Sequence, residues 1–155
     1  MPQGSIIPDN SILVAGQPII LEKEARTITN LAPGRLVIFD TTDYQCTYAG
    51  AAAPDVIGVA DCPSDKRVSD YTFTAKTGVL TTTFTAGDQI RVLSGPVDVK
   101  LMAVSGATIA VGTRLVSAAA GMVSNGATAG QCVGYSLDAP TLTTACKWIR
   151  VHLLI

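Results

Sequence analysis

The stretch Thr108–Asn125, TIAVGTRLVSAAAGMVSN, contains the pattern that decides the fold. A glycine comes just before the strand-like run Arg114-Leu115-Val116, small residues interrupt that run through Gly121, and Met122-Val123 resumes it. Glycine adopts positive φ at no steric cost, so it is typical of a tight turn that leads into a strand. The pattern predicts a hairpin whose connection lies at Gly121.

The same layout occurs earlier in the chain. Residues 30–50, NLAPGRLVIFDTTDYQCTYAG, have it in full, and residues 84–95, FTAGDQIRVLSG, repeat its first half. The segment PDVIGVADCP follows the first copy and GQCVGYSLDAP follows the last, with Gly58 and Gly134 at equivalent places. We interpret this repeat as two similar units in one barrel, each a hairpin followed by a strand. The alternative is a chance similarity between β-rich segments.

The rest of the chain has the same pattern of β-prone residues. Short runs of β-branched, Thr and apolar residues are separated by turn signals about every eight to twelve residues, which is typical of an antiparallel barrel or sandwich. The alanine runs at 51–53 and 118–120 are too short, and too closely flanked by Gly or Pro, to form more than a helical turn. The sequence predicts an all-β fold, a small antiparallel β-barrel (tulip-like or SH3-like) over residues 15–155.

Residues 1–14 differ from the barrel segment. Pro2, Gly4 and Pro8 disfavour regular structure there, so we expect an extended N-terminal arm. The arm contains Ile6 and Ile7, which a fully solvated tail does not need. These two side chains either wait for a neighbouring protein or fold back on their own domain, and the sequence leaves both readings open.

Composition excludes several classes of partner. The chain has 155 residues, a net charge of −1 and only 15% charged residues, and its Lys and Arg are scattered. A nucleic-acid-binding protein normally shows a basic stripe, so we expect no nucleic-acid partner. The longest apolar runs are a few residues, and MPQGSIIPDN lacks the basic and apolar regions of a signal peptide. We expect no membrane association and no export.

The cysteines Cys46, Cys62, Cys132 and Cys146 contain no CxxC pair, so no metal site is predicted. With no export signal, free buried thiols made in a reducing cytoplasm are the simpler interpretation.

The only histidine, His152, is in the alternating run KWIRVHLLI. Alternation places Ile149, Val151 and Leu153 on one face and Trp148, Arg150 and His152 on the other. His152 is therefore expected to be a polar-face residue, and we predict no catalytic site, no cofactor and no enzymatic activity. Trp148 is either an oligomer-interface anchor or a side chain that caps the barrel within one subunit.

Four segments, in order, carry a resemblance to a known group: AGDQIRV (86–92), VGTRLVSAAAGMV (111–123), VGYSLDA (133–139) and WIRVHL (148–153). With them the region from about residue 15 to 155 resembles the head decoration, or cement, proteins of tailed bacteriophages. The four cysteines and the Thr-rich segment FTAKTGVLTTTFTAG (73–87) depart from that group.

The resemblance implies a virion protein on the capsid exterior, made in the host cytoplasm and binding the major capsid protein as a homotrimer. It implies that an N-terminal arm reaches across neighbouring capsid subunits, and the candidate capsid-binding residues are Ile6, Ile7, Pro8, Ile12 and Leu13. Two alternatives remain. One is another virion β-module, such as a tail-tube, fibre-base or head-spike domain, and the other is a small β-barrel enzyme or ligand-binding protein with a site near His152.

Overall fold

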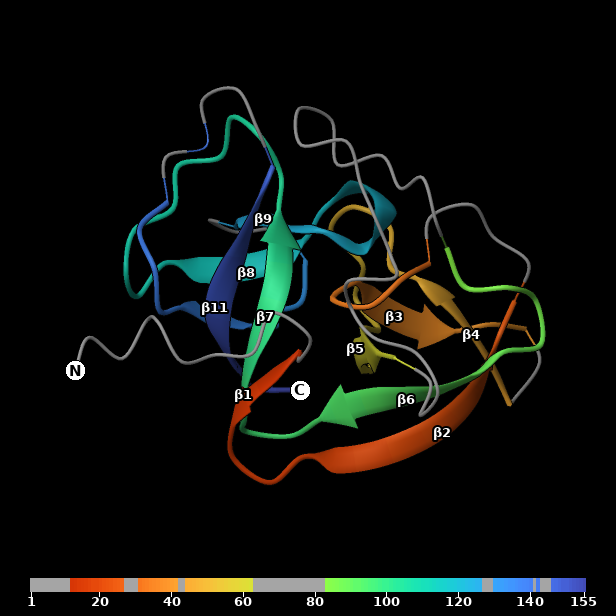
Figure 1. The fold of residues 1–155 in the computed structure, drawn as a ribbon. Coiled ribbons are helices and arrows are strands. Elements are labelled where there is room, and N and C mark those ends of the chain that lie inside the picture. Colours follow the sequence, from red (N-terminus) through yellow and green to blue (C-terminus); the bar gives the residue numbers. More distant parts are fainter. Residues whose placement is uncertain are drawn as a thin grey trace.

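The computed structural model describes residues 12–26, 31–41, 44–62, 83–126, 130–140, 142 and 146–155. Within these ranges the regular secondary structure is almost entirely strand, so the predicted all-β fold is confirmed (Figure 1). The strands are β1 (Leu13–Ala15), β2 (Ile19–Ala25), β3 (Leu36–Phe39), β4 (Gln45–Tyr48), β5 (Gly58–Asp61), β6 (Gln89–Ser94), β7 (Asp98–Ala103), β8 (Arg114–Ser117), β9 (Val123–Asn125), β10 (Gly134–Ser136) and β11 (Lys147–Leu153). In these ranges the helical structure is one 3₁₀ turn, Ala119–Gly121, between β8 and β9.

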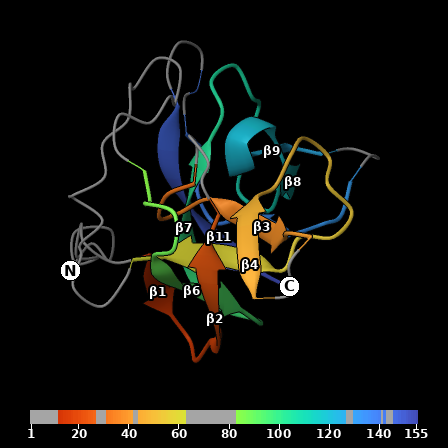
Figure 2. The same ribbon diagram turned by 90° about the vertical axis from the view of Figure 1, so that its right-hand side faces the viewer.

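The strands form two small barrels side by side. The first barrel closes in the order β2-β4-β3-β5-β6. In the second, β7-β11-β10-β8-β9 become a ring because β7 also pairs with β9, and β1 is added to the outside of β7. Seen from the right-hand side of Figure 1, the first barrel lies in front of the second (Figure 2). The predicted small β-barrel is confirmed, but it is present twice, and each ring contains one short parallel contact, β2–β4 or β7–β9.

The two barrels have the same topology. Strands β2 to β6 pair with one another as β7 to β11 do, including the parallel contact between the first and third strand of each set. Backbone hydrogen bonds recur at matching places: Gly34 N–H to Ala60 O (2.8 Å) and Gly112 N–H to Ser136 O (2.7 Å); Ala60 N–H to Arg35 O (2.9 Å) and Ser136 N–H to Thr113 O (3.0 Å); Ile57 N–H to Val37 O (2.9 Å) and Val133 N–H to Leu115 O (3.0 Å); Arg26 N–H to Cys46 O (3.2 Å) and Val104 N–H to Val123 O (3.0 Å). The molecule is a tandem repeat of one five-stranded barrel.

The repeated units of the sequence are therefore real, but their placement in one barrel is wrong. The first unit is β3-β4-β5 and the second is β8-β9-β10, three adjacent strands of different rings. Each unit is closed by its own flanking strands, β2 with β6 or β7 with β11. Gly58 and Gly134 take equivalent places, because a Cβ on either would collide with a backbone carbonyl of the next strand, that of Leu93 or His152.

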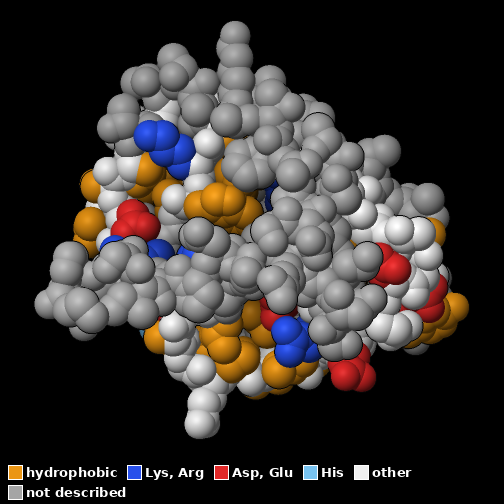
Figure 3. Space-filling model, viewed as in Figure 1, with side chains coloured by type: hydrophobic (Ala, Val, Ile, Leu, Met, Phe, Trp, Pro, Cys, Tyr) orange, Lys and Arg blue, Asp and Glu red, His pale blue; other side chains and the backbone are white. Residues whose placement is uncertain are grey.

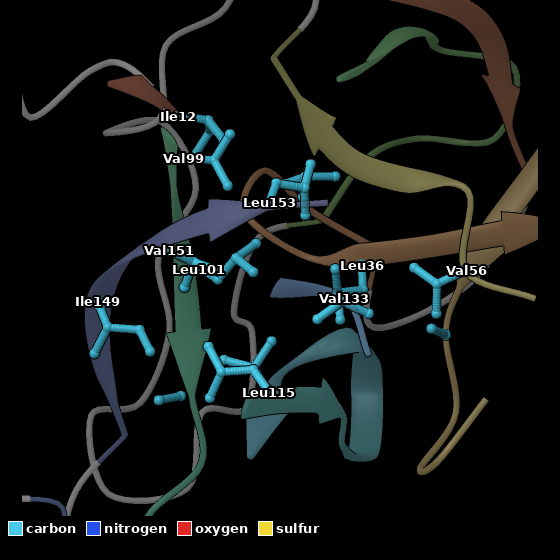
Figure 4. Close-up of a cluster of buried hydrophobic side chains, with 14 of the residues drawn as sticks. Ile12, Leu36, Val56, Val99, Leu101, Leu115, Val133, Ile149, Val151 and Leu153 are labelled. Atoms are coloured by element: carbon cyan, nitrogen blue, oxygen red, sulfur yellow. The ribbon is translucent and has the colours of Figure 1, made fainter. Parts of the chain in front are cut away.

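The main hydrophobic core extends from the inside of the second barrel across the contact between the barrels. Alternation along β3 explains this, since Val37 points into the first barrel while Leu36 points toward the second. Figure 4 shows Leu36 next to Val133 of the second barrel. On β11, Ile149, Val151 and Leu153 are buried in this core, as the alternation of KWIRVHLLI predicts.

We call the interface between the two barrels the seam. Hydrogen bonds stabilise it in addition to the apolar core. The backbone N–H groups of Ala52 and Ala53 donate to the carbonyl and the hydroxyl of Ser117, at 2.8 and 2.9 Å. Arg35, 1% exposed, donates through its guanidinium to the carbonyl of Ala120 at 3.3 Å. Burial lowers the pKa of Arg35 to about 10, and at neutral pH it remains charged. The two alanine runs thus form tight turns that meet at the seam, with Ala52 and Ala120 at φ values of 52° and 56°.

The turn at Gly34 also packs across the seam. Gly34 has a φ of 76°, and a Cβ there would overlap the indole ring of Trp148. Its equivalent in the second barrel, Gly112, has a φ of 81° and nothing within 4 Å of the same Cβ position. Gly34 and Gly112 therefore have the same backbone conformation, but only Gly34 of the two has a side chain packed against it.

We predict that Gly112→Ala destabilises the fold by about 1–3 kcal/mol, the usual cost of a non-glycine residue in this backbone region. Gly34→Ala should cost roughly 1–3 kcal/mol more, because the methyl group must displace Trp148. Urea unfolding followed by tryptophan fluorescence measures both. Equal losses of stability in the two variants would show that Trp148 does not pack tightly on Gly34.

Candidate interaction surface

The outer face of the second barrel carries the ionisable side chains that the sequence singled out. His152 lies half-exposed on β11, with Nδ1 2.7 Å from Asp98 Oδ1 on β7. It is on the polar face, where alternation placed it. Among the described residues, no three His, Cys, Asp or Glu side chains lie close enough together to hold a metal ion. The absence of enzymatic activity stays a prediction.

Arg150 and Asp138 form the most extensively bonded ion pair on this face. The guanidinium donates to one carboxylate oxygen from Nε and Nη2, at 2.9 and 2.6 Å, and the Arg150 backbone N–H donates to the other oxygen at 2.8 Å. Partial burial acts to raise the pKa of Asp138, but the hydrogen bonds and charge of Arg150 outweigh it and hold that pKa below its ordinary value. The pair ties the segment after β10 to β11.

A hollow of about 320 Å³ is present at one end of the second barrel, lined by Thr108, Thr113, Arg114, Asn125 and Gly126. It is wide open to solvent, and the Arg114 guanidinium is already occupied by the carbonyls of Gly126 and Gly130, at 2.8 and 2.9 Å. His152 is not among its lining residues. The hollow does not bring ionisable groups together as a reactive site requires.

All four cysteines are free thiols, as expected from the sequence. Cys46, Cys62 and Cys146 are buried, while Cys132 is half-buried with its sulfur 3.7 Å from the carbonyl of Gly134. Burial raises the pKa of Cys46 to about 12, the nearby Lys23 opposing this shift.

The residues predicted to bind the capsid have separate locations. Ile6, Ile7 and Pro8 lie outside the described residues, so their role stays a prediction. Ile12 is fully buried in this chain's own core, and Leu13 begins β1 and pairs with Val99 of β7. In this fold Ile12 has no surface to offer to another protein, and β1 would have to detach before it could bind one.

Trp148 is half-buried and packs against the main core and against a smaller cluster around Met102. Its ring also fills the space beside Gly34 of the first barrel. The structure thus gives it a role within the subunit, joining the two barrels, which is one of the two readings that the sequence left open. An additional role in an oligomer is untested.

Large apolar side chains are exposed elsewhere, and the sequence analysis did not single them out. On β2, the consecutive Ile19 and Ile20 are 63% and 48% exposed. Phe39 and Tyr44 are exposed around the β3–β4 connection, where Lys23 Nζ lies 4.7 Å from the Phe39 ring centroid. In Figure 3 hydrophobic side chains line the lower edge of the molecule, where β2 and β6 lie in Figure 1. The run PIIL at 18–21 was the signal available in the sequence.

The helical part of the described residues contains no segment long and apolar enough to cross a membrane.

Comparison with known proteins shows a similarity of fold to a solved structure. No family model matches the chain, and no curated protein matches it. Among solved structures, the fold is similar to the N base of the head fiber protein gp8.5 of bacteriophage phi29, with a TM-score of 0.53 and 13% sequence identity. The match covers 88% of this chain and 94% of the other, so it extends over both barrels. At this identity the similarity establishes a shared fold.

We predict that Cys132 is alkylated by iodoacetamide in the native protein, while Cys46, Cys62 and Cys146 react only after unfolding. The reason is that burial blocks access of the reagent to these three thiols, and for Cys46 it also raises the pKa and so disfavours the reactive thiolate. Peptide mapping by mass spectrometry after native and denatured labelling measures this. Native labelling of Cys46 at a rate similar to that of Cys132 would contradict the prediction.

We also predict that Asp138→Asn is less stable than the wild type at pH 7 and that the difference disappears in acid. A carboxylate whose pKa is lowered by folding stabilises the native state above its unfolded pKa of about 3.9, and this contribution is lost as the pH falls through the lower folded value. Urea midpoints at pH 7 and at acidic pH measure it. The matched control is Asp55→Asn at an exposed site, which should change stability little at either pH; an undiminished loss for Asp138→Asn in acid would exclude the charge as the cause.

Proposed function

We propose that this chain is a structural protein of a bacteriophage virion that sits on the outside of the head as a base module. The observation that carries the proposal is the fold similarity to a phage head fiber base over nearly the whole of both chains. A sequence resemblance to phage head decoration proteins, in segments such as VGTRLVSAAAGMV and WIRVHL, points to the same location independently.

The surface of the molecule suits this role. A base module must bury area against a shell and has no need of a reactive cleft. Stable interfaces bury roughly 1,200–2,000 Å² in total, and a capsid shell offers the same binding site many times. Exposed apolar side chains around the β3–β4 connection, Phe39 and Tyr44, are the kind of group that such contacts cover. With few charged residues, binding should depend little on salt.

Cementing of the shell is the second candidate. A cement protein bridges capsid subunits and raises the resistance of the shell to disruption, whereas a fibre base needs only a firm seat. The similarity to the fiber base favours the base module, while the decoration-protein resemblance favours cementing. In both cases we expect several copies to act together, so that individually weak contacts add by avidity. The resemblance to decoration proteins implies three copies.

We predict that the purified protein co-sediments with heads of the phage that encodes it. Electron microscopy with a gold-labelled antibody should place it on the head exterior. Label on the tail, or no co-sedimentation at micromolar protein, would contradict the proposal. Heating heads with and without bound protein separates the two candidates: a cement protein raises the disruption temperature of the shell, and a base module leaves it unchanged.

A further inference from the structure

Strand β2 has an edge that the described residues leave open. On the side away from β6, β2 pairs with β4 only through Glu24 and Ala25. The backbone N–H of Glu24 points to that side, since it donates to Tyr44 O at 2.9 Å. Alternate N–H groups of a strand point the same way, so those of Ile20 and Glu22 also face this edge. Within the described ranges, Ile19–Glu22 have no strand beside them there.

The equivalent edge in the second barrel is filled. Ala25 and Ala103 are equivalent residues, since each lies in the parallel contact of its own barrel. Counting back from them, Leu21 of β2 is equivalent to Val99 of β7, and Glu22 is equivalent to Lys100. In the second barrel β1 lies on this edge, with Leu13 opposite Val99. The backbone N–H of Lys100 donates to Ile12 O at 2.8 Å. The described part of the chain thus shows one copy of the site with an added strand and one copy without.

The copy on β2, which no described strand covers, is also apolar. Ile19 and Ile20 are 63% and 48% exposed, whereas in the second barrel the added strand brings a fully buried Ile12 and a half-buried Leu13. An exposed apolar strand edge is a template for pairing with another extended segment. The chain itself contains a segment with the composition of the strand that fills the other site.

That segment is Ser5-Ile6-Ile7, which repeats the pattern of Ser11-Ile12-Leu13 six residues earlier in the chain. We propose that Ser5–Ile7 of a second copy adds to the open edge of β2 as β1 adds to β7. By the equivalence, the Ile6 carbonyl accepts the Glu22 N–H and Ile7 lies opposite Leu21. Pro8, which has no N–H, ends the added strand after Ile7. The donor in this proposal is a second copy, and the double variant described below distinguishes this from pairing within one chain.

This assignment makes the N-terminal arm a link between copies. Each copy donates one segment and offers one edge, so the contact is head-to-tail and can close into a ring such as a trimer. Backbone hydrogen bonds supply the binding and the two isoleucines supply the side-chain contacts, as in other cases of strand addition. The inference does not rest on the proposed location in a virion.

Two full-length variants, Ile7→Cys and Leu21→Cys, test the contact directly. Mixed under mild oxidation, they should form a disulfide between one copy of each, because residues opposite each other on neighbouring strands have the Cβ separation that a disulfide requires. The unsubstituted chain sets the background from its native cysteines, and Val111→Cys, at an exposed apolar position in another part of the molecule, replaces Leu21→Cys as the matched control. Cross-linking no stronger than in this control would overturn the proposal, as would an intrachain disulfide in the Ile7→Cys/Leu21→Cys double variant.

A second measurement covers the case in which a cysteine disturbs folding. Ile20→Lys places a charge at the exposed edge, and Val111→Lys does the same at the control position. The wild type and Val111→Lys should sediment as oligomers, and Ile20→Lys as a single chain of 16.0 kDa. A monomeric wild type, or an oligomeric Ile20→Lys, would overturn the proposal. Both measurements are made without phage heads, so their outcome is separate from that of head binding.

Discussion

Both barrels depend on the apolar seam between them. A five-stranded ring encloses few side chains, and the buried cluster of the first barrel is the smaller of the two, with Ala25, Cys46 and Ala60 among its members. The larger cluster begins inside the second barrel and continues across the seam, where Leu36 and Leu93 from the outer side of the first barrel join it. Because burial of apolar area is the main favourable term in folding, neither ring is expected to be stable without the other. The chain is thus one folding unit made of two repeats.

The repeated topology gives two equivalent surfaces that differ in detail. Gly34 and Gly112 share a backbone conformation, but only Gly34 lies against Trp148. Strands β2 and β7 have equivalent partners in their two barrels, but among the described residues only β7 carries an added strand. Arg35 is buried at the seam, whereas its equivalent in the second barrel, Thr113, accepts a hydrogen bond from the Ala110 N–H in an exposed turn. Features that both barrels have are those that the fold requires. Features that differ between the barrels are free to serve binding.

Much of the local structure could be predicted from residue patterns. Glycines before strands marked turns with positive φ, and period-two alternation in KWIRVHLLI gave the correct buried face of β11. The position of Ile12 could not be predicted, because an Ile after a Pro- and Asn-containing segment suits an arm as well as a core. The exposure of Ile19 and Ile20 could not be predicted either, because an apolar run of four residues such as PIIL is usually buried.

By itself, the sequence determined the strands, their turns and the two repeated units, because these depend on spacing within ten or so residues. Only the tertiary structure decided that each unit closes its own ring, that Trp148 joins the rings, and that no other described strand pairs with the first half of β2 on the side away from β6. These outcomes depend on which distant strands pair, such as β2 with β6 and β7 with β11, and on the side chains that fill the space between them. Pairing of this kind is set by packing across the whole molecule, and no short stretch of residues encodes it.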